Sequence, residues 1–277
     1  MDYILLLTGC INPNGMPFTS LTNSSVRRAQ YIHSINYYIH NTSFPIVFVE
    51  NSNTDISHVF QASILNSRIE FLTFCGNNNK TKGKGFGEAE IIEYALNNSI
   101  FISSTNKHCF IIKITGRLII NNIEDIVYHH YPFQGQNIVA ASFNSDYSFT
   151  DSRLIVAPFN FYLSFLDNKD QINDFNKKYF ENVLSDSIKQ TKEFHYYPFF
   201  VEPQIIGISG STGEIYLPYK EDYKRRIIYL IHATTLLLDF NKQLSNNKIG
   251  HIKEFFYTLY LLSLKILNKI VMLTTKA

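Results

Sequence analysis

The chain has 277 residues, of which 45% are hydrophobic and 17% are charged. This composition excludes a disordered chain, and the length is enough for one large α/β domain or for a domain with a helical extension. The formal net charge of +2 is too small to indicate a nucleic-acid partner, and we expect none. The three cysteines have no metal-ligand spacing, and their odd number argues against a secreted disulfide scaffold.

The first half of the chain alternates apolar runs with amphipathic segments. Four apolar runs predict buried strands, at 3–7, 45–50, 69–74 and 110–114. The segments between them predict helices, at 24–41, 56–65 and 88–98. Ser24 or Ser25 is the expected N-cap of the first helix. This alternation predicts an α/β fold with a mostly parallel sheet flanked by helices.

The second half of the chain is less regular. Two further strands are expected, at 138–143 and 151–157. Helices are expected at 160–167 and 171–192, and the stretch 198–213 returns to strand and loop. From residue 221 onward the pattern is helical, at 221–240 and 249–273.

Two cations stand at the end of the strand at 110–114, in the stretch Lys113-Ile-Thr-Gly-Arg117. Unpaired charge is costly to bury, so both side chains need partners. Ligands of α/β proteins bind at the carboxyl ends of the strands, so a phosphate or diphosphate is the natural candidate. The alternative is that these cations pair with carboxylates of the protein or extend to solvent.

Three other loops have the residue types of a ligand site. The loop 8–15 contains Gly and Asn residues, which permit a close backbone approach to a ligand. The loop 50–53 offers acidic and amide groups that could hydrogen-bond a base or ribose. The loop 80–88 places lysines and glycines before a helix, where an anion could bind. It matches neither common phosphate-binding motif, and a solvated loop is the alternative.

Glu202 is the first candidate for a general base. It stands among aromatic and apolar residues, which predicts a pKa raised toward a useful value. The Gly- and Ser-rich loop 207–213 follows it and could approach a sugar closely. The alternative is a polar turn with Glu202 in a structural salt bridge.

Four stretches together resemble bacterial GT-A-type glycosyltransferases of the kind found in capsule and lipopolysaccharide biosynthesis. They are Leu5-Leu-Leu-Thr-Gly-Cys-Ile-Asn-Pro13, Val47-Phe-Val-Glu-Asn-Ser52, Lys82-Gly-Lys-Gly-Phe-Gly-Glu-Ala-Glu90 and Ile112-Lys-Ile-Thr-Gly-Arg117. The resemblance covers the organisation of about residues 1–215. It implies a Rossmann-like sheet that binds a nucleotide-sugar donor at its strand ends. It also implies a glycan or lipid-linked acceptor.

The resemblance implies a donor site built from strand ends and from the loop before the third helix. Its residues would be Thr8, Gly9, Asn12, Glu50, Asn51, Ser52, Lys84, Gly85, Lys113, Thr115, Gly116 and Arg117. Most GT-A enzymes hold a divalent metal with an Asp-x-Asp motif, which this chain lacks. We therefore expect no metal-ligand residues and no cofactor, with Lys113 and Arg117 neutralising the diphosphate instead, and the need for a divalent metal stays open.

Transfer requires a base that takes the proton of the acceptor hydroxyl. Glu202 is the first choice and Asp151 the second, although Arg153 would stabilise the charged form of Asp151 if the two pair. On the acceptor side we expect four residues: Arg153, Ser209, Ser211 and Thr212. Two other functions stay open, a nucleotidyltransferase that makes nucleotide sugars and a non-catalytic glycan-binding protein.

The expected organisation has two parts. Residues 1–218 would form the catalytic domain, with a nucleotide-sugar-binding half at 1–125 and an acceptor-side half at 126–218. Residues 219–277 would form a helical C-terminal extension. The basic amphipathic pattern at 249–273 fits peripheral contact with an anionic membrane, or packing on the catalytic domain or a second subunit. We expect a cytoplasmic protein.

Overall fold

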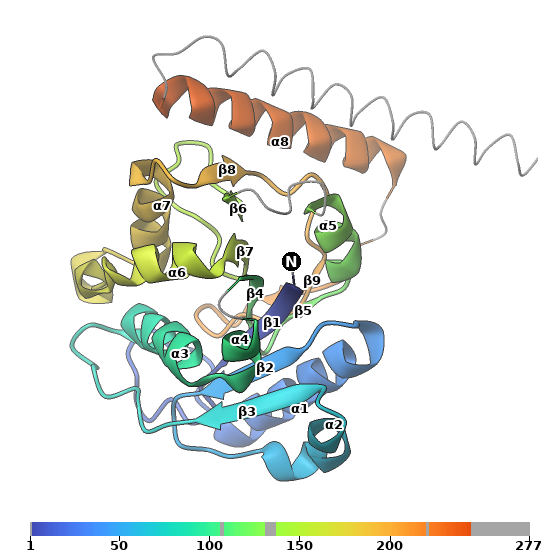
Figure 1. Ribbon diagram of the computed structural model, residues 1–277. Helices are drawn as coiled ribbons and strands as arrows, with labels where there is room; N and C mark the ends of the chain where they lie inside the picture. The colour runs from blue at the N-terminus through green and yellow to red at the C-terminus, as the bar shows by residue number, and fades with distance from the viewer. Residues whose placement is uncertain (1, 106–107, 131–136, 220–221, 245–277) are drawn as a thin grey trace, which may run out of the picture.

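The computed structural model describes residues 2–105, 108–130, 137–219 and 222–244 (Figure 1). Its main sheet has seven strands in the order β3-β2-β1-β4-β7-β6-β8. A smaller sheet has the order β10-β9-β5. The strands are β1 Asp2–Gly9, β2 Ile46–Glu50, β3 Ile69–Thr73, β4 Cys109–Thr115, β5 Ile119–Ile120, β6 Ile138–Ala140, β7 Leu154–Pro158, β8 His195–Tyr197, β9 Ile205–Ile208 and β10 Ile215–Tyr216.

The main sheet is mostly parallel, as predicted. Strands β3, β2, β1 and β4 are parallel neighbours, whereas β7 runs antiparallel to both β4 and β6. The strand order reverses at β1, because β2 lies on one side of it and β4 on the other. In such sheets the loops after these strands diverge and leave a crevice at the carboxyl ends. This topology sets the position of a ligand site between the ends of β1 and β4.

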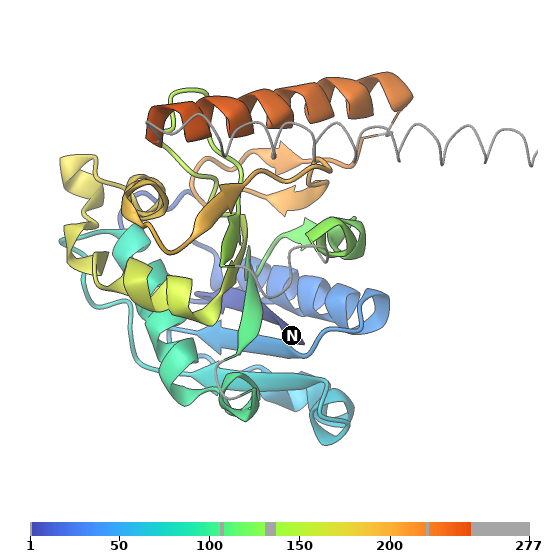
Figure 2. The same ribbon diagram turned by 45° about the horizontal axis from the view of Figure 1, so that its top comes forward.

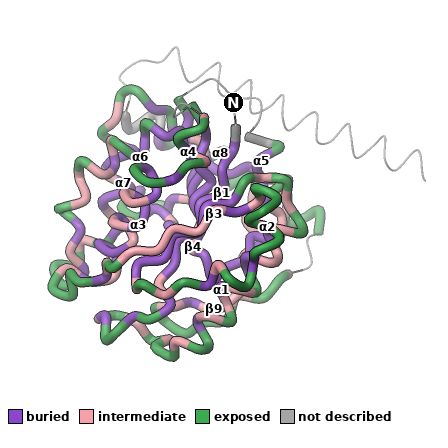
Figure 3. The backbone as a smooth tube through the Cα atoms, turned by 60° about the horizontal axis from the view of Figure 1, so that its bottom comes forward, coloured by how far each residue is buried: buried purple, intermediate pink, exposed green. Residues whose placement is uncertain are grey.

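Helices cover both faces of the sheet (Figures 1 and 2). Side chains of β1 alternate between two hydrophobic cores, with Ile4 and Leu6 in one and Leu5 and Leu7 in the other. Figure 3 shows the central strands as buried chain surrounded by more exposed helices and turns. The helices are α1 Ser24–Asn41, α2 Gln61–Leu65, α3 Lys84–Asn98, α4 Ile100–Ser104, α5 Ile123–His130, α6 Phe159–Leu166, α7 Phe180–Gln190 and α8 Tyr223–Leu244.

Helix α8 lies beyond β8 in both ribbon views (Figures 1 and 2). Its buried face includes Leu230 and Leu237, which pack against Ile138 and Phe200. The backbone carbonyl of Leu236 accepts a hydrogen bond of 2.8 Å from the Tyr147 hydroxyl. Within the described residues, no helix combines the length and apolar content needed to cross a membrane.

The predicted elements of the first half are confirmed, with shifts at their ends. The N-cap of α1 is Asn23, not Ser24 or Ser25, and its side chain accepts from the backbone N–H of Val26. Helix α3 begins at Lys84, four residues before the predicted start. The short helices α4 and α5 were not predicted.

The helix predicted at 171–192 is wrong in its first half. Two short 3-10 turns, Lys169–Gln171 and Asp174–Asn176, precede α7. The Asn173 side chain accepts from the N–H groups of Phe175 and Asn176, a local bond that competes with helix formation. Lys177 then adopts a left-handed φ of 57°, so the helix starts only at Phe180. The helix predicted at 249–273 lies outside the described residues.

Candidate functional site

A pocket of about 700 Å³ lies at the carboxyl ends of β1 and β4. Its volume falls in the range of small-molecule sites. Its walls come from the loops after β1, β2 and β4, from α3, and from the β9–β10 hairpin. Ten of the predicted site residues line it: Thr8, Gly9, Asn51, Lys84, Thr115, Arg117, Asp151, Arg153, Ser209 and Ser211.

Arg117 stands in the pocket wall with part of its hydrogen-bonding capacity unused. Its Nη1 donates to Gln30 Oε1 at 3.2 Å and to the carbonyl oxygen of Ile208 at 3.0 Å. Its Nε is buried and has no hydrogen-bond partner among the described residues. Only 8% of the residue is exposed, and within the described chain it forms no ion pair with a carboxylate. A ligand anion would satisfy this cation.

Arg27 is a second buried cation of the pocket, and sequence reasoning missed it. Its Nε donates to the carbonyl oxygen of Cys10 at 2.7 Å, and its Nη1 donates to that of Leu21 at 3.1 Å. It lies on the buried stripe of α1, four residues before Tyr31 and eight before Ile35. A cation at an apolar stripe position was the signal in the sequence that could have identified it.

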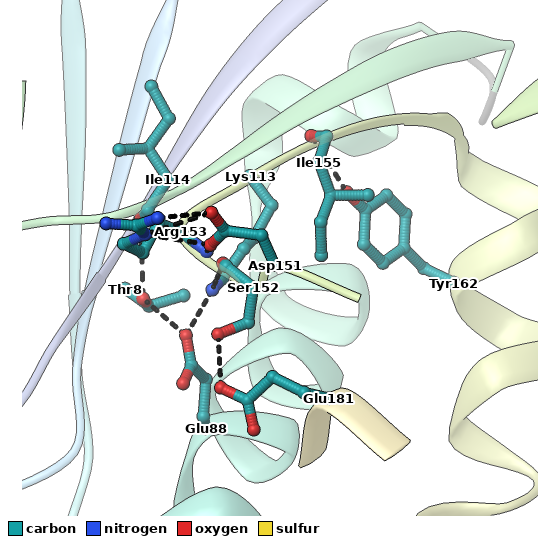
Figure 4. A network of polar contacts seen from close by, with 10 residues as sticks. All are labelled: Thr8, Glu88, Lys113, Ile114, Asp151, Ser152, Arg153, Ile155, Tyr162 and Glu181. Carbon is teal, nitrogen blue, oxygen red and sulfur yellow. Dashed lines mark hydrogen bonds and ion pairs between the residues drawn. The ribbon is translucent and has the colours of Figure 1, made fainter. Parts of the chain in front are cut away.

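Lys113 has a different role from the one predicted. It is fully buried, does not line the pocket, and forms an ion pair with Glu88 of α3 (Figure 4). Its Nζ also donates to the carbonyl oxygen of Ser152 at 2.6 Å. Lys113 faces α3 because it lies two residues after Ile111 on the strand and so shares its face, and Ile111 packs in the core on that side. Pairing with a protein carboxylate, the alternative left open by the sequence, is therefore observed.

Four carboxylates line the pocket: Glu88, Asp151, Glu181 and Glu214. Asp151 forms a bidentate pair with Arg153, with Nε–Oδ1 and Nη2–Oδ2 distances of 2.9 and 2.6 Å. Glu181, in the first turn of α7, accepts from Ser152 Oγ at 2.7 Å (Figure 4). Burial raises the pKa of Glu181, the neighbouring charge of Glu88 raises it further, and the Ser152 hydrogen bond opposes this. Sequence reasoning named neither Glu88 nor Glu181.

Asn51 is held rigidly in the pocket wall after β2. Its N–H donates to the carbonyl oxygen of Gly9 at 3.0 Å, and its carbonyl accepts from Gly76. Its side-chain Nδ2 donates to the carbonyl oxygen of Gly87 at 3.4 Å. The Oδ1 atom is buried and has no partner among the described residues. A ligand N–H or O–H would satisfy this acceptor, which fits the predicted nucleoside side of the site.

The other polar residues after β1 and β2 hold the loops together rather than line the pocket. Glu50 is fully buried and accepts from the backbone N–H groups of Ile11 and Thr54, at 2.7 and 2.8 Å. Ser52 donates to Glu50 and accepts from the N–H of Asn12 at 2.9 Å. The predicted donor contacts of Glu50, Ser52 and Asn12 are thus replaced by contacts within the protein.

The predicted anion site at the start of α3 is occupied by a carboxylate of the protein. Asp174 accepts from the N–H of Gly85 at 3.1 Å, so Gly85 does not line the pocket. Gly83 has a φ of +92°, and a Cβ there would meet Asp174 at 2.5 Å. These glycines therefore make room for Asp174. Lys84 does reach the pocket, where its Nζ contacts the Ser211 hydroxyl.

The hairpin between β9 and β10 covers one side of the pocket. The carbonyl oxygen of Gly210 accepts from the N–H of Ser20 at 3.0 Å, which ties the hairpin to the loop before α1. A Cβ on Gly210 would lie 2.2 Å from the Arg117 Nη2, so a side chain there would force the guanidinium to move. Ser209 Oγ accepts from the N–H of Thr212 at 3.2 Å, and Thr212 is not among the residues that line the pocket.

Gly116 allows close packing of the ends of β1 and β4 and does not line the pocket. Its N–H donates to the carbonyl oxygen of Thr8 at 2.9 Å, and a Cβ on Gly116 would meet that oxygen at 2.7 Å. The absence of a side chain lets the ends of β1 and β4 approach each other. Gly116 was predicted to contact the donor, but it does not line the pocket.

The prediction of a raised pKa for Glu202 is wrong. Glu202 lies outside the pocket lining and forms a bidentate pair with Arg225 of α8, at 2.8 and 2.9 Å. The Arg225 hydrogen bonds hold the pKa of Glu202 below its usual value, whereas a raised pKa was predicted. The structural salt bridge, left open by the sequence, is what the structure shows.

No group of three or more metal-ligating side chains occurs among the described residues. No protein-family profile and no curated protein matches the chain. Similar backbones occur in solved structures, among them a cytidylyltransferase from Leptospira borgpetersenii, with 10% identity, TM-score 0.42, and coverage of 90% of this chain and 99% of that one. Residues 1–349 of S. aureus TarS share 10% identity at TM-score 0.39, over 94% of this chain and 79% of that one.

The bifunctional glycosyltransferase WbbM is also similar, with 9% identity, TM-score 0.39, and coverage of 92% of this chain and 51% of that one. The similar structures thus include both cytidylyltransferases and glycosyltransferases.

Proposed function

We propose that the protein is a glycosyltransferase that moves a sugar from a nucleotide-sugar donor to a glycan or lipid-linked acceptor. One observation carries the proposal. The pocket at the ends of β1 and β4 holds carboxylates together with two buried cations, Arg117 and Arg27, that have no carboxylate partner among the described residues, within about 700 Å³. The cations suit a diphosphate leaving group, and a carboxylate can take the proton of the attacking hydroxyl.

In this proposal the donor spans the wall formed by the loops after β1, β2 and β4. The base lies toward Asn51, whose Oδ1 needs a donor. The diphosphate lies against Arg117 and Arg27, whose planar guanidinium groups suit phosphate oxygens. The sugar then points to the carboxylates on the side of Asp151 and Glu181. The acceptor enters beside Arg153 and the hairpin residues Ser209 and Ser211.

The proposal includes metal-independent transfer in surface polysaccharide biosynthesis. Arg117 and Arg27 supply the positive charge that a divalent metal would otherwise supply to the diphosphate. The lipopolysaccharide or capsule setting rests on the sequence resemblance, as do the catalytic domain at 1–218 and the helical extension at 219–277. Peripheral membrane contact through 249–273, a homo-oligomer and a cytoplasmic location belong to the same proposal.

The test is a screen of nucleotide sugars by thermal shift, followed by mass spectrometry of the products. A donor that binds the native state raises Tm. With an acceptor mixture, a glycosyltransferase releases a nucleoside diphosphate. A nucleotidyltransferase would instead join a sugar 1-phosphate to a nucleoside triphosphate, and the triphosphate would release pyrophosphate. Pyrophosphate release, or binding of glycans without any nucleotide, would contradict the proposal. The role of Arg117 is tested by comparing donor binding in Arg117→Ala and in Arg28→Ala. Arg28→Ala is the matched control, because Arg28 contacts His58 outside the pocket lining.

A further inference from the structure

The carboxylates of the pocket differ in how many of their oxygens are free. Both oxygens of Asp151 accept hydrogen bonds from Arg153, and Oδ1 also accepts the backbone N–H of that residue at 2.9 Å. Glu88 Oε1 is taken by Lys113 and by Thr8. A substrate hydroxyl would have to compete with the Arg153 cation at Asp151, whereas Glu88 has a cation bound directly to one of its two oxygens. Glu214 is exposed on the hairpin.

No cation of the part of the chain that the structure describes forms an ion pair with Glu181. Its Oε1 accepts from the neutral Ser152 hydroxyl at 2.7 Å, and its carboxylate has no other side-chain hydrogen-bond partner among the described residues (Figure 4). Its backbone carbonyl accepts from the N–H of Thr150 at 3.2 Å, which fixes the first turn of α7 to the segment before β7. Glu181 therefore presents a fixed carboxylate to the pocket with one oxygen available.

The charges around Glu181 suit a proton acceptor. Burial raises its pKa and Glu88 on α3 raises it further, whereas the Ser152 hydroxyl, the backbone N–H of Glu181 itself and Lys113 on β4 oppose the change. The Asp151–Arg153 pair, also at the pocket wall, is internally neutralised. A carboxylate is most effective as a general base when its pKa lies near the working pH. The net upward shift moves Glu181 in that direction.

We propose that Glu181 is the general base that takes the proton from the acceptor hydroxyl. This role rests on the proposed glycosyltransferase function. The acceptor oxygen forms a bond to the anomeric carbon, and the bond from that carbon to the donor phosphate oxygen breaks. The nucleoside diphosphate leaves with the bonding electron pair. The acceptor proton passes to Glu181 Oε2 and then to water. This replaces Glu202, which is paired with Arg225, and Asp151, which is paired with Arg153.

The test compares Glu181→Gln with Asp186→Asn, a matched carboxylate-to-amide change on the same helix that lies outside the pocket lining. We expect Glu181→Gln to lower kcat for sugar transfer about 10²–10⁴-fold. Its affinity for the nucleoside diphosphate, measured by calorimetry, should equal that of the wild type. Asp186→Asn should match the wild type in both measurements. Circular dichroism and Tm confirm that each variant is folded.

A second variant, Ser152→Ala, gives a readout that a structural role would not produce. The Ser152 hydrogen bond lowers the pKa of Glu181, so its removal should move the acid limb of the kcat–pH profile to higher pH. Normal kcat in a folded Glu181→Gln protein, or an acid limb unmoved by Ser152→Ala, would overturn the role of Glu181 alone. If the wild type binds no nucleoside diphosphate and transfers no sugar, the proposed function fails and this role fails with it.

Discussion

Lys113 allows the clearest test of how the buried charges are arranged. The change is Lys113→Met, which keeps most of the side-chain volume and removes the charge. Lys113 is fully buried and Glu88 keeps 23% of its side chain exposed. Removing one partner of a buried pair costs about 3–5 kcal/mol, because the other charge is left uncompensated. Since Glu88 is partly solvated, we expect the free energy of unfolding to fall by about 3 kcal/mol, the lower end of this range.

The double variant Lys113→Met, Glu88→Gln tests whether the loss of stability in Lys113→Met comes from the uncompensated charge of Glu88. With both charges removed, no uncompensated ion remains, so the double variant should be more stable than Lys113→Met by about 1–3 kcal/mol. The assay is urea unfolding followed by circular dichroism, since the chain has no Trp for fluorescence. Lys189→Met is the control: its pair with Asp186 is partly exposed, and we expect a loss below about 1 kcal/mol. Wild-type stability of Lys113→Met, or no recovery in the double variant, would refute the reasoning.

Three further predictions concern ionisation, thiol reactivity and metals. Arg225 lowers the pKa of Glu202, so their pair stabilises the protein above the unfolded-state pKa of Glu202 and this stabilisation is lost as pH falls through the folded-state pKa. Glu202→Gln should therefore lower Tm at neutral pH and retain sugar transfer, and in acid the Tm of the variant should approach that of the wild type. Abolished transfer would contradict the position of Glu202 outside the pocket lining. Burial raises the pKa of Cys10 to about 11, so at pH 8 about a thousandth of Cys10 is thiolate. Iodoacetamide should therefore modify the exposed Cys75 first. If mass spectrometry shows Cys10 modified first, the burial of Cys10 in this structure is contradicted. EDTA should leave most of the transfer rate intact, whereas a complete loss restored by manganese or magnesium would show that metal is required.

The first half of the fold was predictable because its periodic patterns are strong. Strand β1 and helix α1 appear where the apolar pattern placed them. The extra length predicted for α7 failed because a single side chain, Asn173, satisfies the local N–H groups before the helix starts. A hydrophobic pattern does not register such a side-chain bond.

The candidate site was predictable where it follows from strand ends. Thr8, Asn51 and Arg117 line the pocket because parallel strands deliver their carboxyl ends to one edge of the sheet. The sequence also showed that Lys113 needs an anion, but it did not show which one, since Glu88 lies on a different element. Glu181 was missed because its position depends on how α7 packs against the segment before β7.

The central claim is that the pocket binds the diphosphate of a nucleotide-sugar donor through Arg117. The most direct measurement is calorimetric titration of UDP, GDP, CDP and ADP into the wild type, Arg117→Ala and Arg28→Ala. We predict that at least one nucleoside diphosphate binds the wild type and Arg28→Ala equally well. Arg117→Ala should weaken that binding at least about tenfold, because a hydrogen bond to a charged group contributes about 1.5–3 kcal/mol. Equal affinity in all three proteins, or no binding of any nucleoside diphosphate to the wild type, would contradict the claim.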